Sequence, residues 1–204
     1  VSSLADPTPS YGLIDRCLVA AFDAGIAPVL ILTKADLASP DDVLARYPGL
    51  DFPVIPVHRR TDRTLVFDGP LIETLTGCTT VLVGHSGVGK STLVNALVPD
   101  AHRAVGVVNA VTGRGRHTST SAYGFGFHGG LLIDTPGLRS FGLAHVDADR
   151  VIHAFADLQP GTANCPRGCT HDEPECGLDA YAAEHGIDPA RLGSLRRLLA
   201  SMRE

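Results

Sequence analysis

The sequence contains no apolar run as long as the roughly 18 residues that a membrane-spanning helix requires. Its longest apolar stretches, such as Pro28–Leu32 and Thr80–Val83, have the length of strands. It also shows no basic and apolar leader segment at its beginning. We therefore expect a cytoplasmic protein without a membrane partner, folded around a core of valine, leucine, isoleucine and alanine.

Lysine is scarce: only Lys34 and Lys90 occur, beside fifteen arginines. Arginine evidently serves wherever a generic positive charge is enough, so we expect lysine to remain where a compact ammonium on a flexible stem is needed. Chance placement of the two lysines is the alternative, and their surroundings decide between the two. The net charge of −5 argues against a protein that grips nucleic acid with its whole surface. It leaves room for a local basic patch at Arg59, Arg60 and Arg63, although solvated loop arginines explain this cluster equally well.

The five cysteines are an odd number and do not form a disulfide framework. Cys165, Cys169 and Cys176 lie within twelve residues, together with His171, which suggests a reducing compartment and a metal site. Three thiolates and one imidazole make a closed tetrahedral set, as in structural zinc sites, whereas catalytic zinc keeps a position open for water. Free cysteines in a flexible loop are the alternative.

Strand and helix patterns alternate along the first two thirds of the chain, which predicts a mostly parallel sheet covered on both faces. From about His145 the character changes to helical segments around a Cys/Pro/Gly-rich knot. We therefore predict one domain over 1–144 and a smaller subdomain over 145–204. The expected helices are Tyr11–Ala24, Pro40–Tyr47, Pro70–Leu75, Lys90–Leu97 and Pro189–Met202, and the expected strands are Pro28–Thr33, Phe52–Val57, Thr79–Val83, Tyr123–Phe127 and Gly130–Ile133; residues His58–Asp68 fit neither pattern.

Residues Gly84–Ser91 match the P-loop pattern G-x-x-x-x-G-K-[ST] at every fixed position, between a predicted strand and a predicted helix. Glycines let backbone N–H groups turn toward phosphate oxygens. Lys90 is then expected to reach the β and γ phosphates, and the Ser91 hydroxyl to ligate Mg²⁺. A glycine-rich turn without a ligand is the alternative. The predicted phosphate cradle comprises Gly84, His85, Ser86, Gly87, Val88, Gly89, Lys90, Ser91 and Thr92.

A second apolar strand ends in Asp134-Thr-Pro-Gly137, about 45 residues after the P-loop. An aspartate at the C-terminal end of a strand lies where ligands bind in parallel sheets. We expect Asp134 to hold Mg²⁺ through water and the Gly137 N–H to face the γ-phosphate. Taken alone, the pattern also fits a polar turn.

The segment Thr33-Lys34-Ala35-Asp36 follows another apolar strand and is similar to the N/T-K-x-D motif of GTPases. The Asp36 carboxylate can accept hydrogen bonds from N1–H and N2–H₂ of guanine, a donor pair that adenine lacks. Lys34 can lie along the plane of the base. The ligands expected are therefore GTP and GDP. In ordinary GTPases this motif follows the P-loop, whereas here it precedes it, which predicts a circularly permuted GTPase.

With these motifs in this order, the chain resembles the RsgA (YjeQ) family. Ile14–Val19 resembles the I-D-R-x-L-V helix of that family, Gly115–Thr120 its G-[RK]-H-T-T-T switch, and Cys165–Cys176 its zinc segment. The resemblance implies an α/β, circularly permuted P-loop GTPase fold in three layers, with a small C-terminal zinc-binding helical subdomain. It also implies hydrolysis of GTP, stimulated by the small ribosomal subunit and its rRNA during late maturation of that subunit.

The sequence departs from the family pattern at three places. Thr33 replaces the commoner Asn, which we expect to weaken one loop-bracing contact, and His58-Arg59-Arg60 stands where Ser-Ala usually helps to hold guanine. Members of that family normally begin with an OB-fold domain, and we expect no counterpart of that domain in this chain.

A polar residue that orients the attacking water is missing after Gly137, because Leu138 stands there. His117 in the switch is our candidate for this role, and Thr118 or Thr120 for binding Mg²⁺ and sensing the γ-phosphate. A surface histidine without a role is the alternative for His117. The competing functions are an ATP-using P-loop kinase and a non-catalytic, zinc-bearing RNA-binding module. We expect a monomer.

Overall fold

The chain divides into two compact units, each built from segments that are separated in the sequence. The computed structural model describes residues 1–47, 52–67, 70–98, 106–108, 122–138, 143, 146 and 148–202. The first unit comprises Val1–Ser10, Leu30–Pro40 and Val54–Ser140, and the second comprises Tyr11–Val29, Asp41–Pro53 and Phe141–Glu204. The second unit thus combines the segments Tyr11–Val29 and Asp41–Pro53 with the C-terminal part of the chain. The division into 1–144 and 145–204 followed the order of the chain and stays a prediction.

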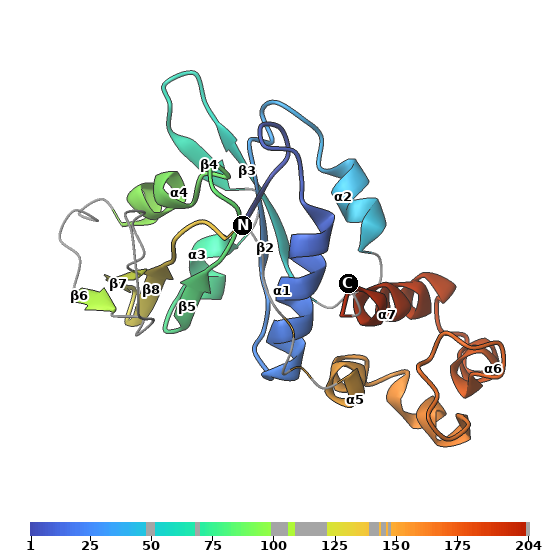
Figure 1. The fold of residues 1–204 in the computed structure, drawn as a ribbon. Helices are drawn as coiled ribbons and strands as arrows, with labels where there is room; N and C mark the ends of the chain where they lie inside the picture. Colours follow the sequence, from blue (N-terminus) through green and yellow to red (C-terminus); the bar gives the residue numbers. More distant parts are fainter. Residues whose placement is uncertain are drawn as a thin grey trace, which may run out of the picture. The chain divides into compact units, whose positions relative to one another are not determined.

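One sheet of the first unit has the strand order β1-β2-β3-β4 (Figure 1). Its strands are β1 (Ser2–Ser3), β2 (Leu30–Thr33), β3 (Val54–Arg59) and β4 (Leu65–Phe67). β2 pairs in parallel with both β1 and β3, whereas β4 is antiparallel to β3. All four residues of β2 are buried, as expected for a central parallel strand covered on both faces.

A second sheet of this unit has the order β5-β8-β7-β6. Its strands are β5 (Thr79–Leu82), β6 (Gly106–Val108), β7 (Ala122–Phe127) and β8 (Gly130–Asp134). Only β5 and β8 are parallel, because the tight β7–β8 turn at His128-Gly129 reverses the chain. The α/β class is therefore confirmed, but the expectation of one mostly parallel sheet is wrong: the described strands form two mixed sheets.

The described part of this unit contains the helices α3 (Leu71–Leu75) and α4 (Lys90–Leu97), the latter with the bounds predicted. α4 packs on β8, and Leu93 and Leu132 are fully buried. Burial of such side chains contributes about 1.5–3 kcal/mol each. This packing holds the beginning of α4 close to the C-terminal end of β8, which is where the candidate site lies.

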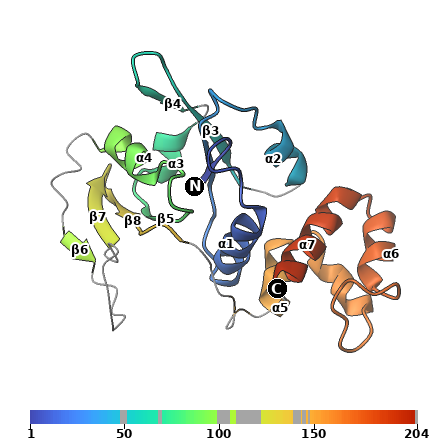
Figure 2. The same cartoon turned by 45° about the horizontal axis from the view of Figure 1, so that its top comes forward.

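The segment that fitted no pattern, His58–Asp68, contains a β-hairpin. Its strands pair Val57 with Phe67 and Arg59 with Leu65. The turn is closed by the Arg60 N–H, which donates to the Thr64 carbonyl at 2.9 Å. Figures 1 and 2 both show β3 and β4 joined as this hairpin, with its turn projecting at the upper edge of the drawing. It had no sequence signal because its second strand is only three residues long.

The second unit is helical. It contains α1 (Tyr11–Asp23), α2 (Asp41–Arg46), α5 (Ala148–Val151), α6 (Gly177–Glu184) and α7 (Pro189–Ser201), with 3₁₀ turns at Ile152–Ala154 and Gln159–Asn164. α1 packs against α5 and α7, and Val19, Phe155 and Leu195 are fully buried. Among the described helices of the whole chain, none is long and apolar enough to span a membrane.

Asp15 on α1 is buried in this unit and joins three of its segments. Its Oδ1 accepts a 2.7 Å hydrogen bond from the Tyr47 hydroxyl, and its Oδ2 lies 3.7 Å from Nε of Arg197 on α7. Burial raises the pKa of Asp15, and the hydrogen bond from Tyr47 and the guanidinium of Arg197 oppose this rise. The Arg197 guanidinium also lies 4.8 Å from the centre of the Tyr47 ring. The Asp of the I-D-R segment is thus a packing element of the helical unit.

Candidate functional site

The P-loop connects β5 to α4 through backbone conformations that favour glycine. Gly87 and Gly89 have φ of 83° and 96°, a region that side chains with a Cβ rarely adopt. Lys90 opens α4 and is buried, and its ammonium donates to the carbonyls of Gly84 at 2.9 Å and His85 at 3.2 Å. Burial lowers the pKa of Lys90, and the Asp134 carboxylate opposes this effect. The ammonium therefore lies at the centre of the loop, where phosphate oxygens could replace the carbonyls.

Asp134 ends β8 directly beside the start of α4. Its Oδ2 accepts a 3.4 Å contact from the Ser91 hydroxyl, whereas its Oδ1 is buried and has no hydrogen-bond partner among the described residues. Burial raises the pKa of Asp134, and the Lys90 ammonium opposes this rise. An orphaned carboxylate oxygen next to a hydroxyl matches the oxygen ligands that Mg²⁺ prefers, because this ion keeps several waters and takes few protein ligands. Ser91 and Asp134 thus fit a magnesium site.

The D-T-P-G segment is joined to the P-loop by its backbone. The Leu138 N–H donates to the Gly84 carbonyl at 3.0 Å, and the Thr135 hydroxyl donates to the Leu82 carbonyl at 2.7 Å. A Cβ at Gly137 would lie only 2.7 Å from Cα of Ser86. Glycine is therefore required here because two backbones touch, and this close approach brings the 137 amide to the edge of the phosphate loop.

These segments enclose an open cleft of about 510 Å³. Three of its lining residues were not predicted as site residues: Thr135 and Pro136, which lie inside the recognised D-T-P-G segment, and Tyr123 on β7, which is 41% exposed. The antiparallel register of β7 and β8 pairs Tyr123 with Asp134 and so brings it to the cleft. No sequence pattern indicated this register. The cleft is lined by Ser86, Gly87, Gly89, Lys90, Ser91, Thr92, Tyr123, Asp134, Thr135, Pro136 and Gly137.

The predicted base motif lies against the P-loop. The hydroxyl of Thr33 donates to the Val88 carbonyl at 2.6 Å, so the residue that replaces the commoner Asn still braces the loop. The Lys34 ammonium lies 3.4 Å from the Gly87 carbonyl and also donates to the Asp6 carbonyl. Lys34 has a φ of 61°, which is uncommon outside glycine and common at strained functional positions.

Asp36 is exposed, and its Oδ1 accepts a 3.0 Å hydrogen bond from the Arg59 backbone N–H. The segment after Val57, which lacks the usual Ser-Ala, thus contributes a backbone donor that orients the carboxylate. Both carboxylate oxygens keep acceptor capacity for further donors.

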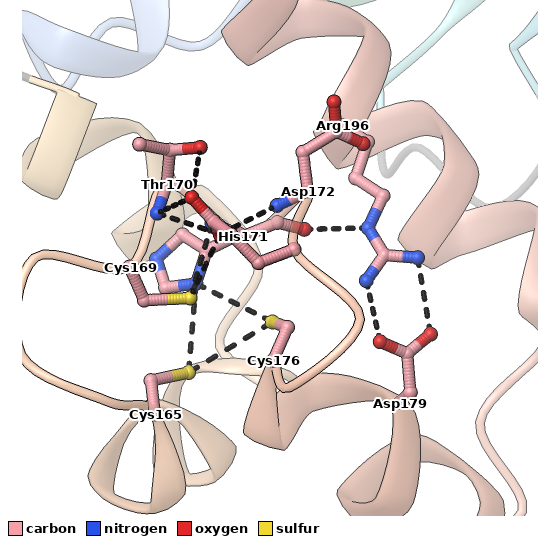
Figure 3. Close-up of polar contacts among 9 residues, drawn as sticks. Cys165, Cys169, Thr170, His171, Asp172, Cys176, Asp179 and Arg196 are labelled. Carbon is pink, nitrogen blue, oxygen red and sulfur yellow. Dashed lines mark hydrogen bonds and ion pairs between the residues drawn. The ribbon is translucent and has the colours of Figure 1, made fainter.

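Four potential metal ligands converge in the helical unit (Figure 3). Nδ1 of His171 lies 3.6, 3.9 and 3.8 Å from the sulfurs of Cys165, Cys169 and Cys176, and the sulfurs of Cys165 and Cys176 are 3.9 Å apart. A zinc ion with bonds of about 2.3 Å to sulfur and 2.0 Å to nitrogen sets tetrahedral edges of roughly 3.5–3.8 Å. The four side chains therefore fit a closed zinc site.

Arg196 on α7 supports this cluster, as Figure 3 shows. Its Nε donates to the His171 carbonyl at 2.6 Å, while its two terminal nitrogens bind Asp179 of α6 at 3.0 and 2.6 Å. Residues that orient metal ligands in this way usually tune metal affinity. The ligand loop is thereby tied to both C-terminal helices, a role of Arg196 that the sequence did not indicate.

Some predicted residues cannot be placed. His117, Thr118 and Thr120 lie outside the described residues, so the roles assigned to them stay predictions.

Comparison with known proteins gives consistent matches. Residues 1–144 match the family model described as RsgA GTPase. The proteins called "Small ribosomal subunit biogenesis GTPase RsgA" in Pseudomonas aeruginosa and Azotobacter vinelandii are both 44% identical to this chain, over 211 and 207 residues. These alignments cover 97% of this chain but 60% of each relative, so the chain spans about 60% of their length.

Two solved structures share the fold. YjeQ from Thermotoga maritima is 26% identical and superposes with a TM-score of 0.65, covering 100% of this chain and 69% of that one. YloQ, described as a circularly permuted GTPase, is 25% identical with a TM-score of 0.62, covering 98% and 66%. The predicted circularly permuted α/β fold is therefore confirmed.

Proposed function

This chain belongs to the RsgA GTPase family, and we propose that it binds and hydrolyses GTP, with the small ribosomal subunit as the partner that stimulates hydrolysis during late maturation of that subunit. The observation that carries the proposal is the 2.6 Å hydrogen bond between Thr33 and the Val88 carbonyl. It joins the base motif to the P-loop although the motifs occur in reversed order in the sequence. One cleft can then hold guanine and phosphates together, as a GTPase requires.

Guanine selectivity rests on Asp36. Its carboxylate would accept from N1–H and N2–H₂ of guanine, while the Arg59 N–H keeps it oriented. Lys34, which already contacts the P-loop at Gly87, would lie along the base. Adenine would supply neither of these two donors, and a carboxylate oxygen that the bound base covers without a donor costs about 1–3 kcal/mol.

The phosphates would occupy the cradle Gly84–Thr92. Backbone amides and the start of α4 favour anions there. The Lys90 ammonium would exchange its two carbonyl contacts for β and γ oxygens, which explains why a buried lysine is retained. Ser91 and Asp134 would hold Mg²⁺, which supplies charge neutralisation at the phosphates when bound. The Gly137 amide would face the γ-phosphate.

Hydrolysis needs a group that positions water, and Leu138 cannot provide it. We assign this role to His117, and a role in binding Mg²⁺ and the γ-phosphate to Thr118. The D-T-P-G segment itself supplies neither a water-positioning group nor a second ligand for Mg²⁺. We therefore expect slow hydrolysis without a partner, on the order of 10⁻⁴–10⁻² s⁻¹ as for unassisted GTPases. The small subunit and its rRNA would then accelerate hydrolysis.

The zinc centre would be structural. Its four ligands leave no position for a reacting water, and it ties the 3₁₀ turn Gln159–Asn164 to α6 where few apolar side chains are available. A factor with such a partner would act in the cytoplasm, and we propose that it acts as a monomer.

The decisive experiment measures phosphate release from GTP with and without purified small ribosomal subunits, with ATP as competitor. We expect subunits to raise the rate at least about 10-fold and ATP to leave it unchanged. Competition by ATP would favour a P-loop kinase. Nucleotide binding without any release, even with subunits, would favour a non-catalytic zinc-bearing RNA-binding module.

A further inference from the structure

The β3–β4 hairpin concentrates unpaired positive charge. Arg59, Arg60 and Arg63 are all exposed, and within the part of the chain that the structure describes none of them makes an ion pair. Of the seven other arginines that the structure describes, five lie within 4.0 Å of an aspartate oxygen: Arg46, Arg150, Arg191, Arg196 and Arg197. In a chain with a net charge of −5, three guanidinium groups within five residues are therefore left for an external partner.

The single acidic residue of the turn does not neutralise this charge. Asp62 uses its Oδ1 to accept from the Thr64 N–H at 2.9 Å and from the Thr64 hydroxyl at 2.7 Å. These hydrogen bonds, and to a smaller extent the charge of Arg60, hold the pKa of Asp62 below its usual range. Its carboxylate thus serves the turn, and residues 59–64 keep a net positive charge.

The arginines are presented on a preformed scaffold. The strands pair up to Arg59 and Leu65, and the Arg63 N–H donates to the Arg60 carbonyl at 2.9 Å inside the turn. Arg63 has a φ of 70°, which the turn imposes on a residue other than glycine. A partner therefore does not have to order the backbone of this hairpin, and the entropic cost of binding is reduced.

We propose that the tip of the β3–β4 hairpin, with Arg59, Arg60 and Arg63, is a docking surface for the phosphodiester backbone of RNA. Guanidinium groups bind phosphate oxygens through paired hydrogen bonds. The tip sequence Arg-Arg-Thr-Asp-Arg-Thr contains no aromatic or aliphatic side chain that would stack on bases or form the apolar centre of a protein interface. The surface therefore recognises phosphates and not base sequence.

This inference rests on the proposed function, because it assigns a contact surface to the RNA-containing partner. It also places that surface beside the base motif, since the Arg59 backbone bonds to Asp36. Among the described residues, neither Arg60 nor Arg63 lines the phosphate cleft. Arg63 also lies outside the segment His58–Arg60 that follows Val57, so it can be changed without altering the predicted base site.

The test uses the full chain and a fluorescein-labelled 16-base-pair RNA duplex, titrated at several salt concentrations. Each arginine–phosphate contact contributes about 1 to the slope of log affinity against log salt. The variant Arg60→Gln/Arg63→Gln should therefore bind the duplex more weakly and reduce the slope by about 2. Arg60→Lys/Arg63→Lys, which keeps the charge, should restore most of the slope. Arg16→Gln/Arg167→Gln removes the same charge elsewhere and should leave the slope nearly unchanged.

Two further measurements separate this inference from the proposed function. Affinity for a fluorescent GDP analogue and GTP hydrolysis without subunits should be the same in the single variant Arg63→Gln, which leaves the segment His58–Arg60 unchanged, and in the unsubstituted chain. Absence of RNA binding by the unsubstituted chain, an unchanged slope in the hairpin variant, or an equal loss in the Arg16/Arg167 control would overturn the inference. Weaker binding to small subunits with unchanged duplex binding would also overturn it and indicate an acidic protein surface. Failure of subunits to stimulate hydrolysis would instead count against the proposed function, since duplex binding requires no hydrolysis.

Discussion

The backbone N–H of Arg59 donates a 3.0 Å hydrogen bond to Oδ1 of Asp36. Oδ1 of Asp36 thus faces the Arg59 N–H, and Oδ2 points away from this donor. A side chain of the same shape at position 36 would have to satisfy the same backbone donor. This relationship makes the outcome of a substitution at this position predictable.

Asp36→Asn should change the base preference from guanine to xanthine. The amide oxygen of Asn would turn to the Arg59 N–H, which directs its NH₂ group toward the base. That group repels the N2–H₂ of guanine but complements the 2-oxo group of xanthine, so GTP affinity should fall about 100-fold or more while XTP affinity rises. Competition binding against a fluorescent nucleotide measures both. Asp36→Ala should lose both ligands, and unchanged GTP affinity in Asp36→Asn would remove Asp36 from the base site.

Thr33→Val should weaken nucleotide binding while keeping the fold. The substitution preserves the shape of the side chain but removes the hydroxyl that donates to the Val88 carbonyl at 2.6 Å. Loss of a hydrogen bond of this kind costs about 0.5–1.5 kcal/mol, which corresponds to a roughly 2- to 10-fold loss of GDP affinity. Isothermal calorimetry measures this, with Thr33→Ser as the matched control that keeps the hydroxyl. Equal affinities of the Val and Ser variants would show that the brace is unimportant.

Gly137→Ala should damage the phosphate site. The added Cβ would lie 2.7 Å from Cα and 2.8 Å from N of Ser86, so one of two backbones must move. Overpacking of this kind costs about 1–3 kcal/mol, and we expect GDP affinity to fall roughly 10- to 100-fold. Gly193→Ala on α7 is the control, because a Cβ there meets nothing within 4 Å. A Gly137→Ala chain with normal affinity would contradict the close approach.

The chain should carry one tightly held zinc ion. Elemental analysis of protein purified without added metal should find about one zinc per chain, and Cys169→Ser should lose it and loosen the C-terminal helices while GDP binding persists. Cys78→Ser is the control, since Cys78 is exposed and outside the cluster. Absence of metal, or a disulfide between Cys165 and Cys176, would argue against the site.

His117→Ala should reduce turnover more than binding. A group that positions water acts mainly in the transition state, so kcat should fall about 100-fold with little change in KM. The assay needs small ribosomal subunits, because we expect the unassisted rate to be too slow to resolve a further decrease. GDP affinity, measured in parallel, should be unchanged. A full stimulated rate in the variant would mean that another group places the water.

The local motifs were predictable because the sequence determines them over short distances. Glycines at 87 and 89 can adopt positive φ, Lys90 opens a helix, and these choices define the phosphate loop without any distant contact. The zinc ligands were predictable for the same reason, since all four lie within one segment of twelve residues. The scarcity of lysine was also informative for the site, because both lysines contact carbonyl groups of the P-loop.

Only the tertiary structure decided how these local pieces meet. The brace from Thr33 to Val88 spans 55 residues, and the pairing of Tyr123 with Asp134 depends on strand register. The β3–β4 hairpin, the antiparallel partners of β8 and the Arg196 support of the zinc loop are likewise absent from any short pattern. The periodicity of apolar residues indicates which face of a helix or strand is buried. Which other segment packs against that face depends on the free energy of packing the whole chain. The sequence therefore determined the chemistry available to this protein, and the fold determined which groups act together.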